Sequence, residues 1–153
     1  MTIHDMSQTR LRAWLTVSIW TIAGAGFLGA FFSGGGPGGW PADSLRHLTG
    51  AVALGFGFAA YWLALWLTRQ RKGRPLVSDE RDVQIVARSN QVTLVVVLVG
   101  VFAFTIGLWT FFEARGQVPV GWMWLVAYGS VILAFLTSSI TTLVLDRGVA
   151  RDG

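Results

Sequence analysis

The sequence contains no cysteine, little charge and only two histidines. Without cysteine the chain cannot form a disulfide, a thiolate metal site or a dithiol redox couple, and it has no cysteine nucleophile. Charged residues make up 13% of its 153 residues and hydrophobic residues 53%, whereas soluble domains are about 25% charged. This composition excludes an ordinary water-soluble fold and indicates a single domain, residues 1–153, built in a lipid bilayer.

Sequence motifs of the common enzyme classes are also missing. No G-x-S-x-G, Walker A, H-E-x-x-H or dinucleotide-binding pattern occurs. His4 and His47 are not placed to form a haem-binding pair, and His47 is interpreted as a residue at the membrane interface. We therefore expect a protein that is not an enzyme and that has no cofactor or metal site.

Four apolar stretches are long enough to cross a bilayer. They cover residues 13–32, 48–68, 92–112 and 120–145, and none contains Asp, Glu, Lys, Arg or His. A transmembrane helix needs roughly 20 apolar residues, and in lipid each span must satisfy its own backbone hydrogen bonds as a helix. The sequence predicts an all-α integral membrane protein, a bundle of four transmembrane helices. The lack of ionisable groups in the spans argues against a proton-coupled transporter.

Basic residues are distributed unequally between the connections. Ten of the twelve Lys and Arg residues lie in the N-terminal tail, in the loop at 69–91 and at the C-terminus, and only Arg46 and Arg115 lie elsewhere. Because positive loops face the cytoplasm, we expect a cytoplasmic loop at 69–91 and two cytoplasmic termini. In a membrane protein this charge indicates contact with anionic lipids and not with nucleic acid.

The two short connections have similar sequences. FFSGGGPGGW follows the first span and FFEARGQVPVGW follows the third. One interpretation is a duplication that produced two tandem helical hairpins. The other is that every short outer hairpin needs a Pro/Gly turn and an interfacial tryptophan.

Small residues four positions apart predict close packing between the first two spans. The alternative is that they form a homodimer face. The pairs are Ala25 with Gly29, Gly26 with Ala30, Ala51 with Gly55, Ala53 with Gly57, and Gly55 with Ala59.

The fourth span contains the polar run T-S-S-I-T-T. Thr137 lies one helical turn before Thr141, and Ser138 one turn before Thr142. One hypothesis is that these four hydroxyls line a polar notch open to the cytoplasm. The alternative is that they bond to carbonyls of their own helix or bridge to a neighbouring helix.

The stretch S-D-E-R-D at 78–82 holds three of the eight acidic residues. Ser78 or Asp79 is a good N-cap, and carboxylates in a first turn stabilise the positive end of the helix dipole. Nothing after Asp82 breaks the helix, so we expect one continuous helix from about Asp79 to Phe112. The third helix then extends about 12 residues into the cytoplasm, where we expect it to pack beside Asp146 and Arg147.

The motif D-E-R-D-x-x-I, which spans residues 79–85, resembles a feature of a group of small uncharacterised bacterial four-span membrane proteins. The resemblance covers the central loop, the third span and the four-span layout. It implies a location in the bacterial inner membrane, and it implies no reaction or ligand.

Two functions are compatible with these features. The first is a non-enzymatic accessory or assembly subunit that docks a protein partner through its cytoplasmic loop. The expected partners are a protein or further copies of the chain in a homo-oligomer. The second is an oligomeric small transporter or channel component. A third, simpler interpretation is that the acidic residues only cap a helix. The candidate partner-binding residues are Asp79, Glu80, Arg81, Asp82, Ile85 and Arg88.

Overall fold

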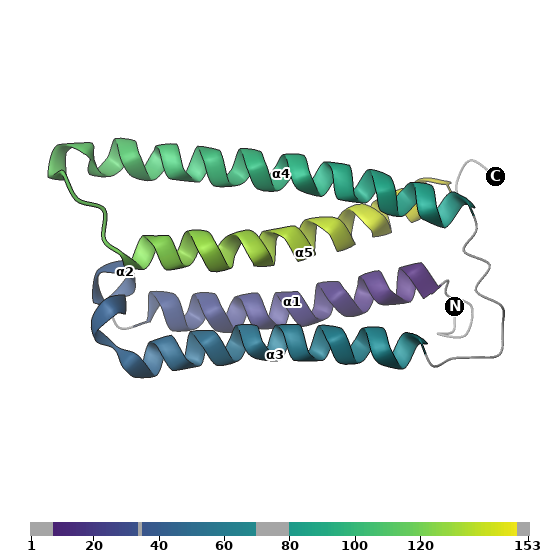
Figure 1. Cartoon of the computed structure of the whole chain (residues 1–153), viewed down its shortest axis with the longest axis horizontal. Coiled ribbons are helices and arrows are strands. Elements are labelled where there is room, and N and C mark those ends of the chain that lie inside the picture. The colour runs from purple at the N-terminus through teal and green to yellow at the C-terminus, as the bar shows by residue number, and fades with distance from the viewer. Residues whose placement is uncertain (1–7, 34, 70–79, 150–153) are drawn as a thin grey trace.

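The computed structural model describes residues 8–33, 35–69 and 80–149, and these are organised around four long helices (Figure 1). Each of the four is long and apolar enough to cross a membrane. The predicted all-α class and the four predicted spans are therefore confirmed. The helices are α1 (Gln8–Phe32), α3 (Ser44–Arg69), α4 (Glu80–Phe112) and α5 (Gly121–Val149).

The third span continues beyond its apolar part, as the sequence predicts. α4 runs without a break for 33 residues, which corresponds to about 50 Å. Glu80 and Asp82 lie in its first turn, where carboxylates offset the partial positive charge of the helix end. The predicted cap at Ser78 or Asp79 lies outside the described residues.

The long helices form two hairpins, α1 with α3 and α4 with α5, which are joined by packing of α1 along α5. Their order across the molecule is α4, α5, α1 and α3 (Figure 1). α3 and α4 therefore stand at opposite edges, and α4 packs mainly on α5. α1 and α4 begin, and α3 and α5 end, at the same end of the molecule. We call it the basic end, and we call the opposite end, which holds the short connections, the hairpin end.

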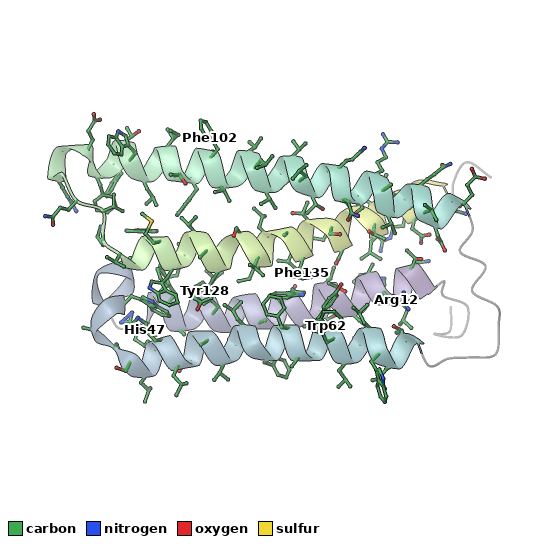
Figure 2. All side chains as sticks on the ribbon, viewed as in Figure 1. Arg12, His47, Trp62, Phe102, Tyr128 and Phe135 are labelled. Carbon is green, nitrogen blue, oxygen red and sulfur yellow. The ribbon has the colours of Figure 1, made fainter. Side chains whose placement is uncertain are left out.

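Aromatic side chains fill the core between α1, α3 and α5. Trp20 and Phe27 of α1 are fully buried. The ring of Trp20 stacks on Phe135 of α5 with 4.3 Å between centroids, and Phe27 meets the edge of Tyr128 at 5.1 Å. Such pairs add about 0.5–1.5 kcal/mol each to the burial of their area. Figure 2 shows Tyr128 and Phe135 between α5 and the α1–α3 hairpin, whereas Phe102 points away from the other helices.

Small residues allow α1 and α3 to approach closely, as predicted. A Cβ atom on Gly57 would lie 3.0 Å from Cβ of Ala23, and one on Gly26 would lie 3.5 Å from Cβ of Ala53. Only part of the predicted set lies on this contact face. Gly26 is exposed although it lies at the contact. The other exposed members are Ala25, Gly29, Ala51, Gly55 and Ala59.

The two short connections differ in structure although their sequences are similar. The first contains α2 (Gly36–Gly39) and the 3-10 helix η2 (Trp40–Ala42), and the second contains the 3-10 helix η3 (Glu113–Arg115). Trp40 is buried, while Trp122, its counterpart in the repeat, is only half-buried. A duplication of the hairpin therefore stays a prediction.

Arg46 of α3 ties the first connection to the end of α1. Its Nη2 donates to the carbonyl oxygens of Phe31 at 3.3 Å and Gly36 at 3.1 Å, and its Nε donates to that of Ala30 at 3.4 Å. The last carbonyls of a helix have no partner within it, so the guanidinium serves as a side-chain cap. The Asp43 carboxylate lies 3.8 Å from Nε. Charge counting along the chain does not reveal this role.

His47 also lies at the hairpin end (Figure 2). Its ring lies 4.9 Å from that of Trp40 and 5.6 Å from that of Trp124, centroid to centroid. The side chain thus belongs to an aromatic cluster where α3 begins. The described residues contain no group of three His, Cys, Asp or Glu side chains that could hold a metal ion.

Candidate functional site

The first turns of α4 are fixed to α5 at the basic end. Ile85 and Ser89, which lie one turn apart, are buried. Ser89 Oγ donates to the carbonyl oxygen of Ser138 at 2.6 Å, and Thr142 Oγ1 lies 3.1 Å from Ser89 Oγ. Because Ser89 is 1% exposed, little water competes for these bonds, and they hold the two helices in one register.

A charged cluster connects three helices at the same end. The Asp146 carboxylate of α5 lies 3.9 Å from Nε of Arg10 in α1 and 4.0 Å from Nη2 of Arg81 in α4. The predicted packing of the α4 extension beside Asp146 is therefore confirmed, whereas Arg147 is exposed. The Asp146 and Arg10 side chains are half-buried and that of Arg81 is exposed, so the cluster orients the three helix ends.

The structure does not gather the predicted partner-binding residues on one face. Glu80, Arg81 and Arg88 are exposed, and Asp82 is half-buried. Ile85 is 6% exposed, because it shares the α5-facing side of the helix with Ser89. Asp79 lies outside the described residues.

Two exposed apolar residues on the extension, Val83 and Val86, were not among the predicted residues. They are 57% and 43% exposed although they precede the apolar span at 92–112. A helical wheel of the extension could have identified Val83, because it lies opposite Ile85 and Ser89. Exposed apolar side chains outside a span mark a candidate contact surface.

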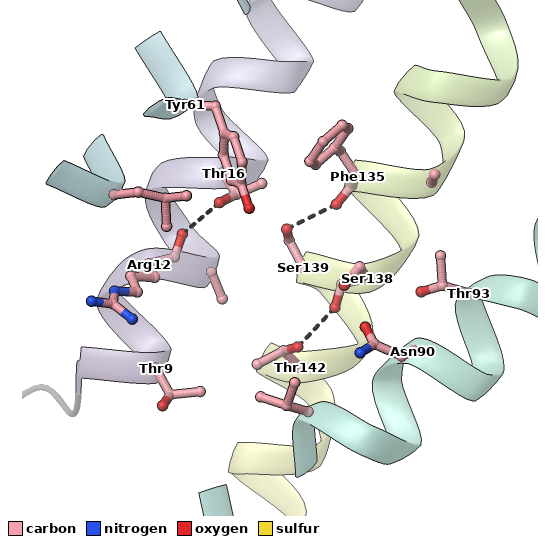
Figure 3. Close-up of a pocket in the computed structure, with 14 residues that line it drawn as sticks. Thr9, Arg12, Thr16, Tyr61, Asn90, Thr93, Phe135, Ser138, Ser139 and Thr142 are labelled. Atoms are coloured by element: carbon pink, nitrogen blue, oxygen red, sulfur yellow. Dashed lines mark hydrogen bonds between the residues drawn. The ribbon is translucent and has the colours of Figure 1, made fainter. Parts of the chain in front are cut away.

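A groove of about 500 Å³ opens at the basic end and is lined by all four long helices (Figure 3). We call it the polar groove because most of its lining residues carry a hydroxyl, amide or guanidinium group, although apolar atoms make up more of its surface. α1 and α3 form one wall, and α4 and α5 form the other. Its lining includes Arg12, Thr16, Tyr61, Asn90, Ser139 and Thr142.

The predicted polar notch coincides only in part with this groove. Ser138 and Thr142 line it, and so does Ser139, whereas Thr137 and Thr141 are half-buried elsewhere. The hydroxyls of Ser139 and Thr142 donate to carbonyl oxygens one turn earlier in α5, both at 2.8 Å. Their oxygen lone pairs remain as acceptors.

Arg12 is the one charged side chain among the described residues that line the polar groove. Its Nε donates to Thr68 Oγ1 at 3.0 Å, and Thr68 Oγ1 in turn lies 2.8 Å from the carbonyl oxygen of Ala64. This chain of bonds links α1 to α3 and orients the guanidinium. No carboxylate pairs with Arg12 within the part of the chain that the structure describes.

Replacing Ser89 by alanine is expected to lower the free energy of unfolding by about 1 kcal/mol, because the change removes the hydrogen bonds that join α4 to α5. Reversible unfolding in mixed micelles, followed by circular dichroism, measures the loss. Thr105→Ala is the matched control, since its exposed hydroxyl donates only to Val101 of its own helix at 2.7 Å. Equal losses of unfolding free energy in the two variants would show that the Ser89 hydrogen bonds do not stabilise the packing of α4 on α5.

Comparisons with known proteins give one match. No curated protein and no solved structure matches the chain. A family model described as "Predicted membrane protein (DUF2178)" matches residues 14–142, which include most of α1 and α5 and all of α3 and α4. The expected membership of a membrane protein family is confirmed at this level, while the D-E-R-D-x-x-I motif and a bacterial origin stay predictions. The chain, a multi-pass membrane protein with four candidate spans, belongs to the DUF2178 family of predicted membrane proteins.

Proposed function

We propose that this protein is a non-enzymatic accessory or assembly subunit that docks a protein partner through the extension of α4 beyond its span. The proposal rests on one observation, that this segment is helical and is held on α5. Residues 80–91 remain helical outside the apolar span at 92–112, and the Ser89 hydrogen bonds fix them on α5. A helix held rigidly in this way presents its outer side chains without a large ordering cost on binding.

The outer side of the extension combines charge with apolar area. Arg81 and Arg88 lie seven residues apart and thus on one flank of the helix, where Arg81 also lies 4.0 Å from the Asp146 carboxylate. Val83, which is 57% exposed, lies on the other flank. Arginine is enriched at protein interfaces, and apolar side chains supply the buried part of the contact. A partner with acidic and apolar side chains complements this surface. We call it the docking surface and define it as Glu80, Arg81, Val83, Gln84, Ala87 and Arg88.

The proposal places the basic end on the cytoplasmic side of a bacterial inner membrane. The unequal distribution of basic residues supports this orientation, because cytoplasmic connections carry the excess of Lys and Arg. A reporter fused after residue 76 that proved to lie outside the cytoplasm would contradict it.

The docking surface can be tested by replacing two of its residues with glutamate. In the variant V83E/R88E both changed side chains are exposed, so the fold is retained while the surface becomes acidic. Wild-type protein purified from native membranes in mild detergent is expected to retain a partner protein. The amount of this partner that co-purifies with the variant is expected to be lower by about tenfold or more, since a lost hot spot costs 2 kcal/mol or more. Quantitative mass spectrometry of the co-purified proteins measures this ratio.

The hairpin end offers a matched control for this experiment. Arg115 and Val120 are both exposed there, so R115E/V120E makes the same chemical changes at the opposite end of the molecule. It is expected to retain the partner at the wild-type level. If both double variants recover the same proteins as the wild type, the docking proposal is wrong.

The polar groove favours a second candidate, an oligomeric small transporter or channel component. Its hydroxyl groups and its position between all four helices suit a polar vestibule. The helices are arranged in the order α4, α5, α1 and α3 and do not close a ring, so a pore would need further copies of the chain. A strictly monomeric state in lipid would contradict this candidate.

A further inference from the structure

The charge of Arg12 lies at the boundary between the apolar part of α1 and water. Arg12 immediately precedes the apolar span at 13–32, which places its guanidinium at the depth of lipid headgroups if the span crosses the bilayer. Its hydrogen bond to Thr68 uses Nε, which leaves the two Nη groups as donors. Because no lining residue in the described chain is acidic, the groove favours an anionic ligand.

Further donors surround the groove. The ring of Tyr61 packs against Phe135 with 5.0 Å between centroids, and Figure 3 shows Tyr61 reaching into the space between α1 and α5. The Asn90 amide lines the groove from α4. A guanidinium, a phenol and an amide together supply donors for several oxygen atoms, which suits a phosphate group.

The groove also has apolar walls, which come from α3, α4 and α5. α3 and α4 both line it, yet they stand at opposite edges of the helix order and are not packed against each other. The gap between them is therefore not closed by a helix contact. Leu65, Val86, Ala134 and Phe135 provide apolar walls next to the polar groups. A free phosphate would leave these walls uncovered, whereas acyl chains would cover them.

We propose that the polar groove is a specific site for one anionic phospholipid, with its phosphate at Arg12 and its acyl chains leaving between α3 and α4. Basic pockets between transmembrane helices are suited to such headgroups. The site is separate from the docking surface and does not depend on it. It gives the basic end a lipid-binding function in addition to a protein contact.

Native mass spectrometry of the full chain in detergent tests this proposal by counting retained lipids. The probes are phosphatidylglycerol, phosphatidylcholine with the same acyl chains, and inorganic phosphate. Wild-type protein is expected to retain one phosphatidylglycerol molecule in preference to phosphatidylcholine. Arg12→Gln is expected to weaken this retention about tenfold, as for the loss of a charge-assisted hydrogen bond.

Two further variants separate the groove from general attraction. Arg147→Gln removes the same charge from an exposed site at the same end that does not line the groove, and it is expected to retain phosphatidylglycerol as wild type does. Ala134→Phe keeps Arg12 but fills part of the groove, so it is also expected to weaken the retention of phosphatidylglycerol about tenfold. This second variant decides the question if Arg12→Gln does not fold.

Four outcomes would overturn the proposal. Equal retention of the two lipids indicates an ordinary lipid shell. Equal weakening by Arg12→Gln and Arg147→Gln indicates attraction by net charge alone. Unchanged retention in Ala134→Phe places the lipid outside the groove. Binding of inorganic phosphate as tight as that of phosphatidylglycerol identifies a free anion as the ligand.

Discussion

Replacing Gly121 by alanine is expected to lower the free energy of unfolding by about 3 kcal/mol, near the upper end of overpacking effects. Gly121 is buried at the first position of α5. A Cβ atom there would collide with the carbonyl oxygen of Pro37 and would lie 2.9 Å from both the carbonyl carbon and Cα of Pro37. These are backbone atoms and not the end of a flexible side chain, so α2 or the start of α5 must move.

The displacement would also disturb the turn that begins α5. The backbone N–H of Trp122 donates to the carbonyl oxygen of Pro119 at 3.0 Å, and that of Met123 donates to Val120 at 2.9 Å. Trp122 in turn lies 6.4 Å from the ring of Phe31, centroid to centroid. A shift of Gly121 therefore weakens the contact between the two hairpins at this end. Reversible unfolding in mixed micelles, followed by tryptophan fluorescence, measures the loss.

Gly129→Ala is the matched control in the same helix. A Cβ atom at Gly129 would meet nothing within 4 Å, and alanine has the higher helix propensity by up to about 1 kcal/mol in water. The control is expected to be as stable as wild type or slightly more stable. A Gly121→Ala protein as stable as Gly129→Ala would show that the contact with Pro37 is not tight in the folded protein.

The spans and the α4 extension could be predicted because they depend on local properties of the chain. Length and hydropathy determine whether a segment crosses lipid, and the run from Glu80 to Phe112 contains no residue that breaks a helix. Helix packing depends on which faces meet. The sequence contains five small-residue pairs in α1 and α3. Only the structure shows that Gly26, Ala53 and Gly57 lie at the contact, whereas a Cβ atom on Gly55 would meet nothing within 4 Å.

The candidate site was predicted less completely, since its residues come together only in the folded chain. Ser138 and Thr142 could be proposed from their spacing on one helix, but Arg12 and Tyr61 belong to two other helices. The order α4, α5, α1, α3 brings all of them to one groove. Ile85 was proposed for partner binding because it lies near Arg81 and Arg88 on the helix. Its burial against α5 depends on a packing direction that the pattern of α4 alone does not determine.

Arg46 and Arg115 provide a second example of this limit. In the sequence they are the two basic residues of the short connections and carry equal weight in the orientation argument. In the structure Arg46 is 8% exposed and its guanidinium bonds three carbonyl oxygens. Arg115 is exposed and lies 5.6 Å from the ring centroids of Phe111 and Phe112. The difference arises from the end of α1, which lies beside the start of α3.

Arg46→Gln is expected to lower the free energy of unfolding by about 3 kcal/mol, because a buried group and its partners lose their compensating bonds together. The carbonyl oxygens at the end of α1 lose their side-chain cap, and the Asp43 carboxylate loses a cation at 3.8 Å. The cation over the Trp40 ring, 5.6 Å from its centroid, is lost as well. The same unfolding measurement in mixed micelles detects the change.

Two controls identify the origin of this loss. Arg115→Gln removes the other basic residue of the short connections and is expected to cost less than about 0.5 kcal/mol, as for exposed charges. Arg46→Lys keeps the charge but not the planar fork, so it is expected to recover only part of the stability. If Arg46→Lys is as stable as wild type, the contribution of Arg46 is one of charge, and the capping of α1 by its guanidinium is not what stabilises the hairpin end.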